Sequence, residues 1–259
     1  MLLTAAAPAH AFKISISDPK VRVQAEPGQV VNGSMRVENP SDQEILIRVY
    51  MEDFVYIAPF DGSKKFLIPE TSKFSCASWV SFSPQEFTLP PFGKKNIDYT
   101  IRVPENARGG HYSVLFFETM LGEMQKEEGY RVNVLGRIGS LFFIEMKGAE
   151  KKAEITEIAV KENSFRGIYA NTGDLFTKVN TTFYVLDSQS MVIDRKEENE
   201  IYILPPDQTE FTLTPSSDLA AGEYTLIATF DLQDGDTLIR EIDFSKDRNG
   251  KLTIREIRD

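Results

Sequence analysis

Few residues of this chain have the types and spacing that catalysis requires. The sequence holds two histidines, His10 and His111, and a single cysteine, Cys76. A Ser-His-Asp triad would have to use His111, yet no G-x-S-x-G or comparable nucleophile context accompanies it. Cys76 lies in the apolar stretch FSCASWV, which favours a small buried side chain over a reactive thiol. Acidic residues are abundant, but no carboxylate pair stands out, so the sequence predicts a protein that is not an enzyme.

Metal and phosphate sites are equally sparse. Zinc needs several Cys or His ligands, which this chain cannot supply, and no G-x-x-x-x-G-K-[ST] loop is present. The segment from Ser245 to Glu256 copies part of an EF-hand loop, with Asp247, Asn249 and Gly250 at its third, fifth and sixth positions. Its first ligand position holds serine, and Asn-Gly between alternating stretches is typical of a plain hairpin. We therefore expect no cofactor and no metal.

Composition indicates a strand-rich globular chain that does not bind nucleic acid. The chain has 259 residues, of which 41% are hydrophobic, and Phe and Tyr are frequent at 18 and 9 residues. Aromatic side chains fit the pleated surface of a sheet. The formal net charge is -10, and an acidic surface repels phosphate backbones. This length allows two domains of ordinary size.

The N-terminus is interpreted as a truncated export signal, residues 1–11. It is short, apolar and rich in small residues, and Ala9-His10-Ala11 has the A-x-A form of a signal-peptidase site. The mature chain would then begin at Phe12. No other stretch approaches the ~18 apolar residues that a membrane-spanning helix needs. The expected product has no transmembrane segment and is periplasmic or secreted.

Period-two alternation, broken by turn residues, recurs along the whole chain and predicts an all-β fold. In EILIRVYMED, for example, Ile45, Ile47, Val49 and Met51 share one face. The first series gives roughly seven to nine strands, as an immunoglobulin-like sandwich requires. A charged, apolar-poor stretch at 147–154 separates it from a second series. We predict an N-terminal sandwich at 12–147 and a C-terminal sandwich at 150–259.

The two series repeat each other. The segment that begins LPPFGKKNIDYTIRVP at Leu89 matches the segment that begins LPPDQTEFTLTP at Leu204, and both continue into Gly-x-Tyr and an apolar run. The stretches RVENPSDQ and IYANTGD add a matching Asn-led turn. The tyrosines of the Gly-x-Tyr pairs, Tyr112 and Tyr224, are placed to form the tyrosine corner of immunoglobulin-like domains. The repeat unit is thus a whole domain, and the predicted architecture is two tandem immunoglobulin-like β-sandwiches.

Within the first series, EPGQVVNGSMRVENPSDQEILIRVY and SWVSFSPQEFTLPPFGKKNIDYTIRVPENARGGHYSVLFFE carry a family pattern. It combines Pro-Gly before a strand, an Asn-led turn after it, a Ser-Pro before a Leu-Pro and a Val-Pro before a Gly-x-Tyr. This pattern resembles bacterial immunoglobulin-like modules of the pilus-chaperone, major-sperm-protein and WxL-interacting type. The resemblance covers about 100 residues of the first domain and implies the sandwich fold. For pilus chaperones it also implies that the last strand of the first domain is lent to an incomplete subunit by strand addition.

The run from Glu127 to Met146 is the strand that this resemblance singles out. Tyr130, Val132 and Val134 form one apolar face, and two glycines interrupt the alternation after them. The resemblance further implies a basic pair that grips the terminal carboxylate of the subunit. Lys20 or Arg22 would supply one member, and Arg131 or Arg137 the other. The alternative is that this strand pairs only within its own sheet.

Two functions follow as expectations. The first is an exported, non-enzymatic protein-binding module, similar to a pilus chaperone or surface-assembly factor, whose partner is a secreted or surface protein subunit. The second is a structural cell-envelope protein that binds cell-wall polysaccharide, with Tyr56, Phe60 and Phe66 as its exposed aromatic residues.

Overall fold

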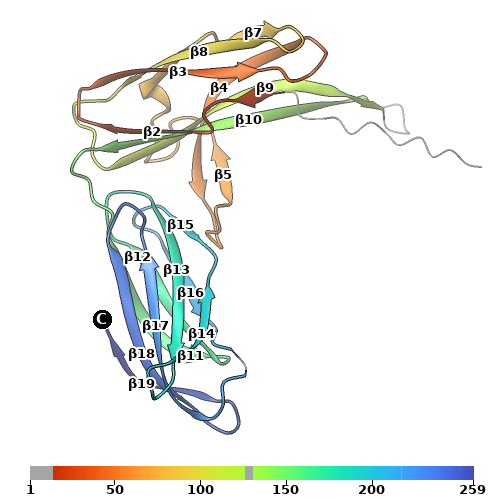
Figure 1. Ribbon diagram of the computed structural model, residues 1–259. Coiled ribbons are helices and arrows are strands. Elements are labelled where there is room, and N and C mark those ends of the chain that lie inside the picture. The colour runs from red at the N-terminus through yellow and green to blue at the C-terminus, as the bar shows by residue number, and fades with distance from the viewer. Residues whose placement is uncertain (1–13, 126–130, 217) are drawn as a thin grey trace, which may run out of the picture. The chain divides into compact units, whose positions relative to one another are not determined.

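The computed structural model describes residues 14–125, 131–216 and 218–259 (Figure 1). The predicted export signal, residues 1–11, lies outside the described residues. The described residues form strands and one turn of 3-10 helix, η1 (Ala77–Trp79), so the predicted all-β fold is confirmed. In this described part of the chain, no helix is long and apolar enough to cross a membrane.

The chain divides into two compact units. The first comprises the described residues up to Phe54, then Phe66–Ala107 and His111–Lys147. The second comprises Val55–Lys65, Arg108–Gly110 and Gly148–Asp259. Two short segments that lie within 12–147 in the sequence therefore belong to the second unit.

The N-terminal sandwich consists of two facing sheets. One sheet has the order β1-β3-β8-β6, and the other has the order β2-β10-β9-β4-β5, with β7 also paired to β4. The first strand is split, because β1 joins the first sheet and β2 joins the second. The strands are β1 (Ser15–Ile16), β2 (Lys20–Ala25), β3 (Val30–Glu38), β4 (Ile45–Tyr56), β5 (Lys64–Leu67), β6 (Val80–Ser83), β7 (Glu86–Leu89), β8 (Lys94–Arg102), β9 (Gly110–Gln125) and β10 (Arg131–Met146).

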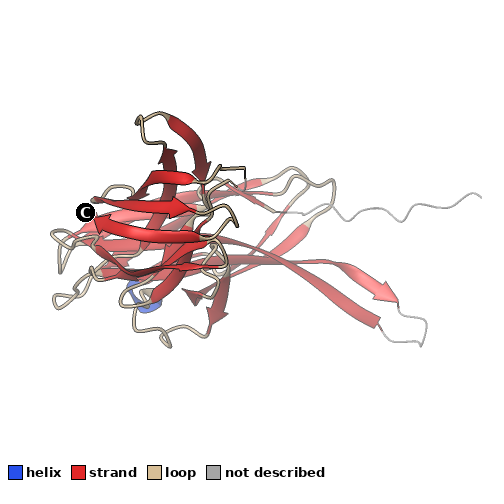
Figure 2. Ribbon diagram, turned by 90° about the horizontal axis from the view of Figure 1, so that it is seen from below, coloured by secondary structure: helices blue, strands red, loops and turns tan. Residues whose placement is uncertain are grey.

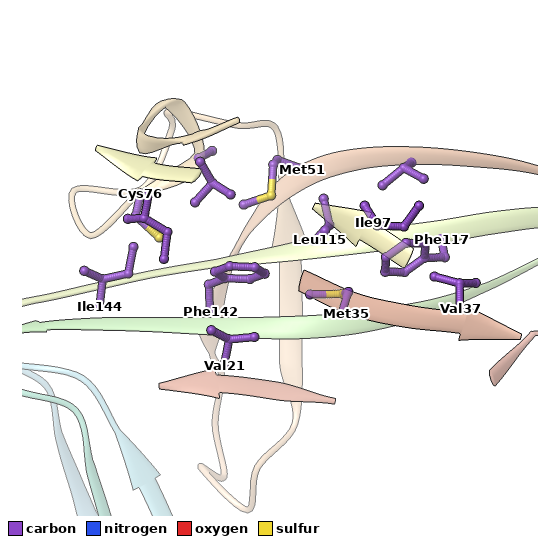
Figure 3. Packing of buried hydrophobic residues seen from close by; sticks show 14 of the residues in the cluster. Val21, Met35, Val37, Met51, Cys76, Ile97, Leu115, Phe117, Phe142 and Ile144 are labelled. Atoms are coloured by element: carbon purple, nitrogen blue, oxygen red, sulfur yellow. The ribbon is translucent and has the colours of Figure 1, made fainter. Parts of the chain in front are cut away.

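Alternate side chains of both sheets fill the core of this sandwich (Figure 3). The predicted inward face of β4 is confirmed, since Ile45, Ile47, Val49 and Met51 all belong to the core. Alternating residues of β10 do the same from the neighbouring part of the sheet, where Phe142 and Ile144 are fully buried. Burying one large apolar side chain contributes about 1.5–3 kcal/mol, so this core fixes the register of its strands.

The C-terminal sandwich is built in the same way. One sheet has the order β11-β12-β16, and the other has the order β14-β13-β17-β18-β19, with β15 also paired to β13. Its core contains Phe183, Phe230 and Phe244, all fully buried. The predicted pair of tandem sandwiches is thus confirmed. The strands are β11 (Ala153–Lys161), β12 (Ser164–Asn171), β13 (Thr177–Leu186), β14 (Val192–Glu197), β15 (Ile201–Ile203), β16 (Gln208–Leu213), β17 (Gly222–Asp231), β18 (Thr237–Lys246) and β19 (Leu252–Arg258).

One buried asparagine in the first sandwich links the repeated turn to the repeated Leu-Pro-Pro. The side chain of Asn39 is 1% exposed. Its Nδ2 donates to the carbonyl oxygen of Gln43 at 2.7 Å and to that of Pro90 at 2.9 Å. Its Oδ1 accepts from the backbone N–H of Ser41 at 3.0 Å. The amide therefore closes the turn and ties it to a segment some fifty residues away in the chain.

The second sandwich repeats this device with Asn171. Its Nδ2 donates to the carbonyl oxygen of Leu175 at 2.9 Å and to that of Ile203, just before the second Leu-Pro-Pro, at 3.2 Å. Its Oδ1 accepts from the N–H of Gly173 at 3.1 Å. Buried carbonyl groups need such partners. The repeat in the sequence therefore reflects one hydrogen-bonded clamp that is built twice.

The two Gly-x-Tyr tyrosines differ in their contacts. Tyr224 Oη donates to the backbone carbonyl of Ala220 at 2.9 Å, which is the tyrosine corner that the sequence predicts. Tyr112 is fully buried, and its ring packs edge-on against Phe143 with centroids 5.2 Å apart. The same motif thus supports a loop in one sandwich and an aromatic cluster in the other.

Candidate functional site

Part of one edge of β10, the open edge, is not paired with any described strand. In its sheet β10 lies between β9 and β2. The parallel pairing with β2 covers Leu141–Met146 alone, opposite Lys20–Ala25. Among the described strands, none pairs with residues 131–139 on that side. Figures 1 and 2 show β9 and β10 running together beyond the other strands of their sandwich. Such an edge exposes unpaired N–H and C=O groups to any added strand.

The hydrogen bond at the start of the β2 pairing shows which groups face this edge. Leu141 donates its N–H to the carbonyl oxygen of Pro19 at 3.0 Å. Successive residues of a strand direct their backbone groups to opposite edges. Residues an even number of positions before Leu141, including Leu135 and Arg137, therefore direct theirs to the open edge.

The side chains of β10 also alternate between two environments. Ile138 packs against the core of the sandwich, together with Phe142 and Ile144. Leu135 and Arg137 point to the opposite, outer face, where Leu135 is 57% exposed. The predicted partner-binding residue Val134 is half-buried.

Sequence reasoning missed Leu135, although the sequence carries a signal for it. The adjacent apolar residues Val134 and Leu135 break the apolar–polar alternation. One of the two side chains must therefore lie on the face of the strand that points away from the core of the sandwich. Of the other predicted residues, Tyr130 lies outside the described residues, as do the side chains of Arg131 and Val132. These three stay predictions.

Arg137 is held on the outer face of its own sheet. Its Nη1 donates to Glu52 Oε1 at 2.8 Å and to Tyr50 Oη at 3.3 Å. The guanidinium also lies over the ring of Phe116, 4.0 Å from the centroid. Tyr50 Oη in turn donates to Glu118 at 2.9 Å, and burial raises the pKa of this tyrosine. This network fixes the outer face beside the open edge.

The structure does not bring Arg137 together with Arg22. In the β2–β10 register Arg22 pairs with Phe143, six residues beyond Arg137, which is about 20 Å along a strand. Arg22 instead has Lys20 as its cationic neighbour. The charged groups of Lys20 and Arg22 lie 5.1 and 5.4 Å from the centroid of the Phe143 ring, and both side chains are exposed. Lys20 and Arg22, both on β2, therefore lie together, and a pairing of either with Arg131 stays a prediction.

The residues weighed for catalysis have ordinary structural contacts. Cys76 is fully buried, and burial raises the pKa of its thiol to about 12, so it is a thiol at neutral pH. The ring of His111 packs against Trp79 with centroids 4.2 Å apart, and its Nδ1 lies 3.2 Å from the carbonyl oxygen of Ser75. Both residues thus take part in packing around η1.

The EF-hand-like segment is the hairpin between β18 and β19. Asp247 Oδ1 accepts from the backbone N–H groups of Asn249 and Lys251 at 2.8 and 2.9 Å, and Glu256 binds Arg258 at 2.7 Å. Within the described residues, no group of three or more His, Cys, Asp or Glu side chains is placed to hold a metal ion. The carboxylates of this segment stabilise a turn and a strand.

The aromatic residues expected to bind polysaccharide are not arranged as an exposed platform. Tyr56 is 5% exposed, and its ring stacks on that of Phe176 within the second unit, with centroids 5.0 Å apart. Phe60 packs against the core of the second unit. Phe66 lies edge-on against Phe116 at 4.9 Å. The expectation of exposed rings is therefore wrong for Tyr56, and Phe60 is half-buried, whereas Phe66 is 38% exposed.

Comparisons with known proteins identify the fold. No protein family and no curated protein matches this chain. Among solved structures, the class 5 fimbriae chaperone CfaA aligns with a TM-score of 0.51 and 16% identity, over 87% of this chain and 97% of that chain. A chain from the chaperone–tip adhesin complex of CFA/I fimbriae aligns with a TM-score of 0.53 and 14% identity, over 87% and 96%. The resemblance predicted from the sequence is thus confirmed for the fold, and this chain has the two-domain β-sandwich architecture of fimbrial chaperones.

Proposed function

We propose that this chain is a periplasmic, non-enzymatic chaperone or assembly factor that holds a secreted or surface protein subunit by strand addition to β10. The observation that carries the proposal is the open edge at residues 131–139, beside a β2 pairing that begins at Leu141. Added strands gain affinity from main-chain hydrogen bonds and specificity from alternate side chains. β10 offers both, through the backbone groups of Leu135 and Arg137 and through the exposed apolar side chain of Leu135.

The solved structures with this fold support the choice of partner. One is a fimbriae chaperone, and the other comes from a complex of a chaperone with a tip adhesin. A fold alone does not assign a function, so the strand edge and the basic pair of this chain are the features that support this one. Lys20 and Arg22 lie where β2 meets β10, and two exposed cations there suit the terminal carboxylate of a bound subunit.

Charged substitutions on β10 test this proposal. We expect the double variant Val132→Asp and Val134→Asp to lose capture of the subunit, because a desolvated carboxylate opposes burial between strands. The measurement is crosslinking and co-purification of the tagged chain from its native cell envelope. Val192→Asp is the matched control, since Val192 is 58% exposed on the edge strand β14 of the other sandwich. Equal capture by the double variant and the wild type, with both folded by circular dichroism, would refute strand addition.

A further inference from the structure

A groove crosses the outer face of the sheet next to the open edge. Its volume is about 490 Å³, within the range of small-molecule pockets. Three exposed apolar side chains from three neighbouring strands line it: Leu46 of β4, Met120 of β9 and Leu135 of β10, exposed by 54%, 50% and 57%. Three exposed apolar side chains that meet in one groove make this surface a candidate interaction site.

The walls of the groove follow from the register of its strands. β4 pairs with β9 so that Arg48 faces Glu118, and with β7 so that Arg48 also faces Glu86. Leu46 and Met120 lie two residues beyond Arg48 and Glu118, and therefore on the same outer face. Thr119 Oγ1 donates to the carbonyl oxygen of Leu46 at 2.8 Å and fastens the two strands under the groove.

Among the described residues that line the groove, the charged side chains are mainly negative. Glu44, Glu86 and Glu118 contribute carboxylates, and Arg48 contributes one guanidinium, 3.6 Å from Glu86. That ion pair is exposed on both sides, so it holds Arg48 only weakly. This excess of carboxylates favours a bound segment with basic residues beside its apolar side chain, and it disfavours a segment with acidic residues there.

We infer that this groove binds a loop or terminal extension of the same subunit that adds its strand to β10, through one large apolar side chain flanked by basic residues. The inference rests on the proposed function. Leu135 belongs to both surfaces, since its backbone faces the open edge and its side chain lines the groove. Strands lie about 4.8 Å apart, so Leu46 of β4 is about 10 Å from β10 across the sheet. The added strand reaches Leu135, and only a separate segment of the subunit reaches Leu46 and Met120.

Defined peptides test the groove independently of strand addition. The probe is acetyl-Gly-Lys-Leu-Lys-Gly-amide, and the readout is the methyl NMR resonances of Leu46, Met120 and Leu135 in the full chain. We expect these resonances to shift with the probe, and to shift less when its leucine is alanine or its lysines are glutamates. Equal responses to all three peptides, or no shift at about 10 mM, well above millimolar affinity, would overturn the inference.

Variants in the full chain separate the groove from the strand edge. With the subunit identified by crosslinking to β10, we expect Leu46→Ser and Met120→Ser each to bind it about 10-fold more weakly. Val30→Ser is the matched control, because Val30 is also 54% exposed in the same unit but lies outside the groove. Wild-type affinity of both groove variants would overturn the inference and leave strand addition standing. If Leu46→Ser and Met120→Ser bind the subunit weakly while Leu135→Pro binds it with wild-type affinity, the result would instead overturn the proposed function.

Discussion

Replacing Leu135 by proline is expected to weaken capture of the subunit by about 100-fold or more, while the free chain stays folded. The N–H of Leu135 faces the open edge, where no described strand accepts it. Proline is tolerated at such an edge position, because no hydrogen bond within the sheet is lost. In the complex, by contrast, an acceptor of the added strand would lose its donor, which costs about 1–3 kcal/mol, and the strand would also meet the proline ring.

Two further variants make this prediction specific. Leu135→Ala removes the side chain but keeps the N–H, and it is expected to weaken capture by only about 10-fold. Val134→Pro places the ring on the edge that pairs with β9, and it is expected to destabilise the free chain. Binding is measured by titration with the purified subunit, and unfolding by denaturant. Equal affinities of Leu135→Pro and Leu135→Ala would show that the backbone of this residue takes no part in binding.

The variants Asn39→Ala and Asn171→Ala are each expected to lower the free energy of unfolding of their own sandwich by about 3 kcal/mol. Each removes an amide that donates to backbone carbonyl groups, which are buried for Asn171 and partly buried for the two closest acceptors of Asn39. One unsatisfied buried group costs about 1–3 kcal/mol. The Asn171 amide serves two buried carbonyl groups, and the Asn39 amide also donates to the buried carbonyl oxygen of Leu89 at 3.3 Å. The melting temperature should fall by more than about 10 °C.

Scanning calorimetry checks this prediction with Asn96→Ala as the matched control. Asn96 is exposed on β8, so its loss should change stability by less than about 0.5 kcal/mol. We expect the two clamp variants to lower different transitions when the sandwiches unfold separately. If the two clamp variants lose no more stability than Asn96→Ala does, the hydrogen-bonded clamp does not explain the repeat in the sequence.

The sequence predicts the double sandwich well, because its evidence is local and occurs twice. Alternation defines the strands, and the matching segments at Leu89 and Leu204 define the domains. The structural reason for these matching segments is not visible in any one stretch of the sequence. Asn39 reaches Pro90, and Asn171 reaches Ile203, only after the strands between them have folded.

The site is predicted only in part, because it depends on register between distant strands. The strand that ends at Met146 follows from its length and its apolar run, but its open half follows from the point where β2 begins to pair. Arg137 looks like a free cation in the sequence, whereas Glu52, some 85 residues earlier, binds it. The groove needs Leu46, Met120 and Leu135 side by side, which no stretch of sequence shows.

Amide hydrogen exchange along β10, measured with and without the bound subunit, shows whether the subunit adds a strand to this edge. Exchange reports which backbone N–H groups are hydrogen-bonded, residue by residue. Strand addition predicts that the amides of Leu135 and Arg137 exchange fast in the free chain and become protected in the complex. The amides of Val134 and Ile138, which face β9, should be protected in both states. Unchanged exchange at Leu135 and Arg137 on binding would contradict the account, because it would show that the subunit is held without adding a strand to this edge.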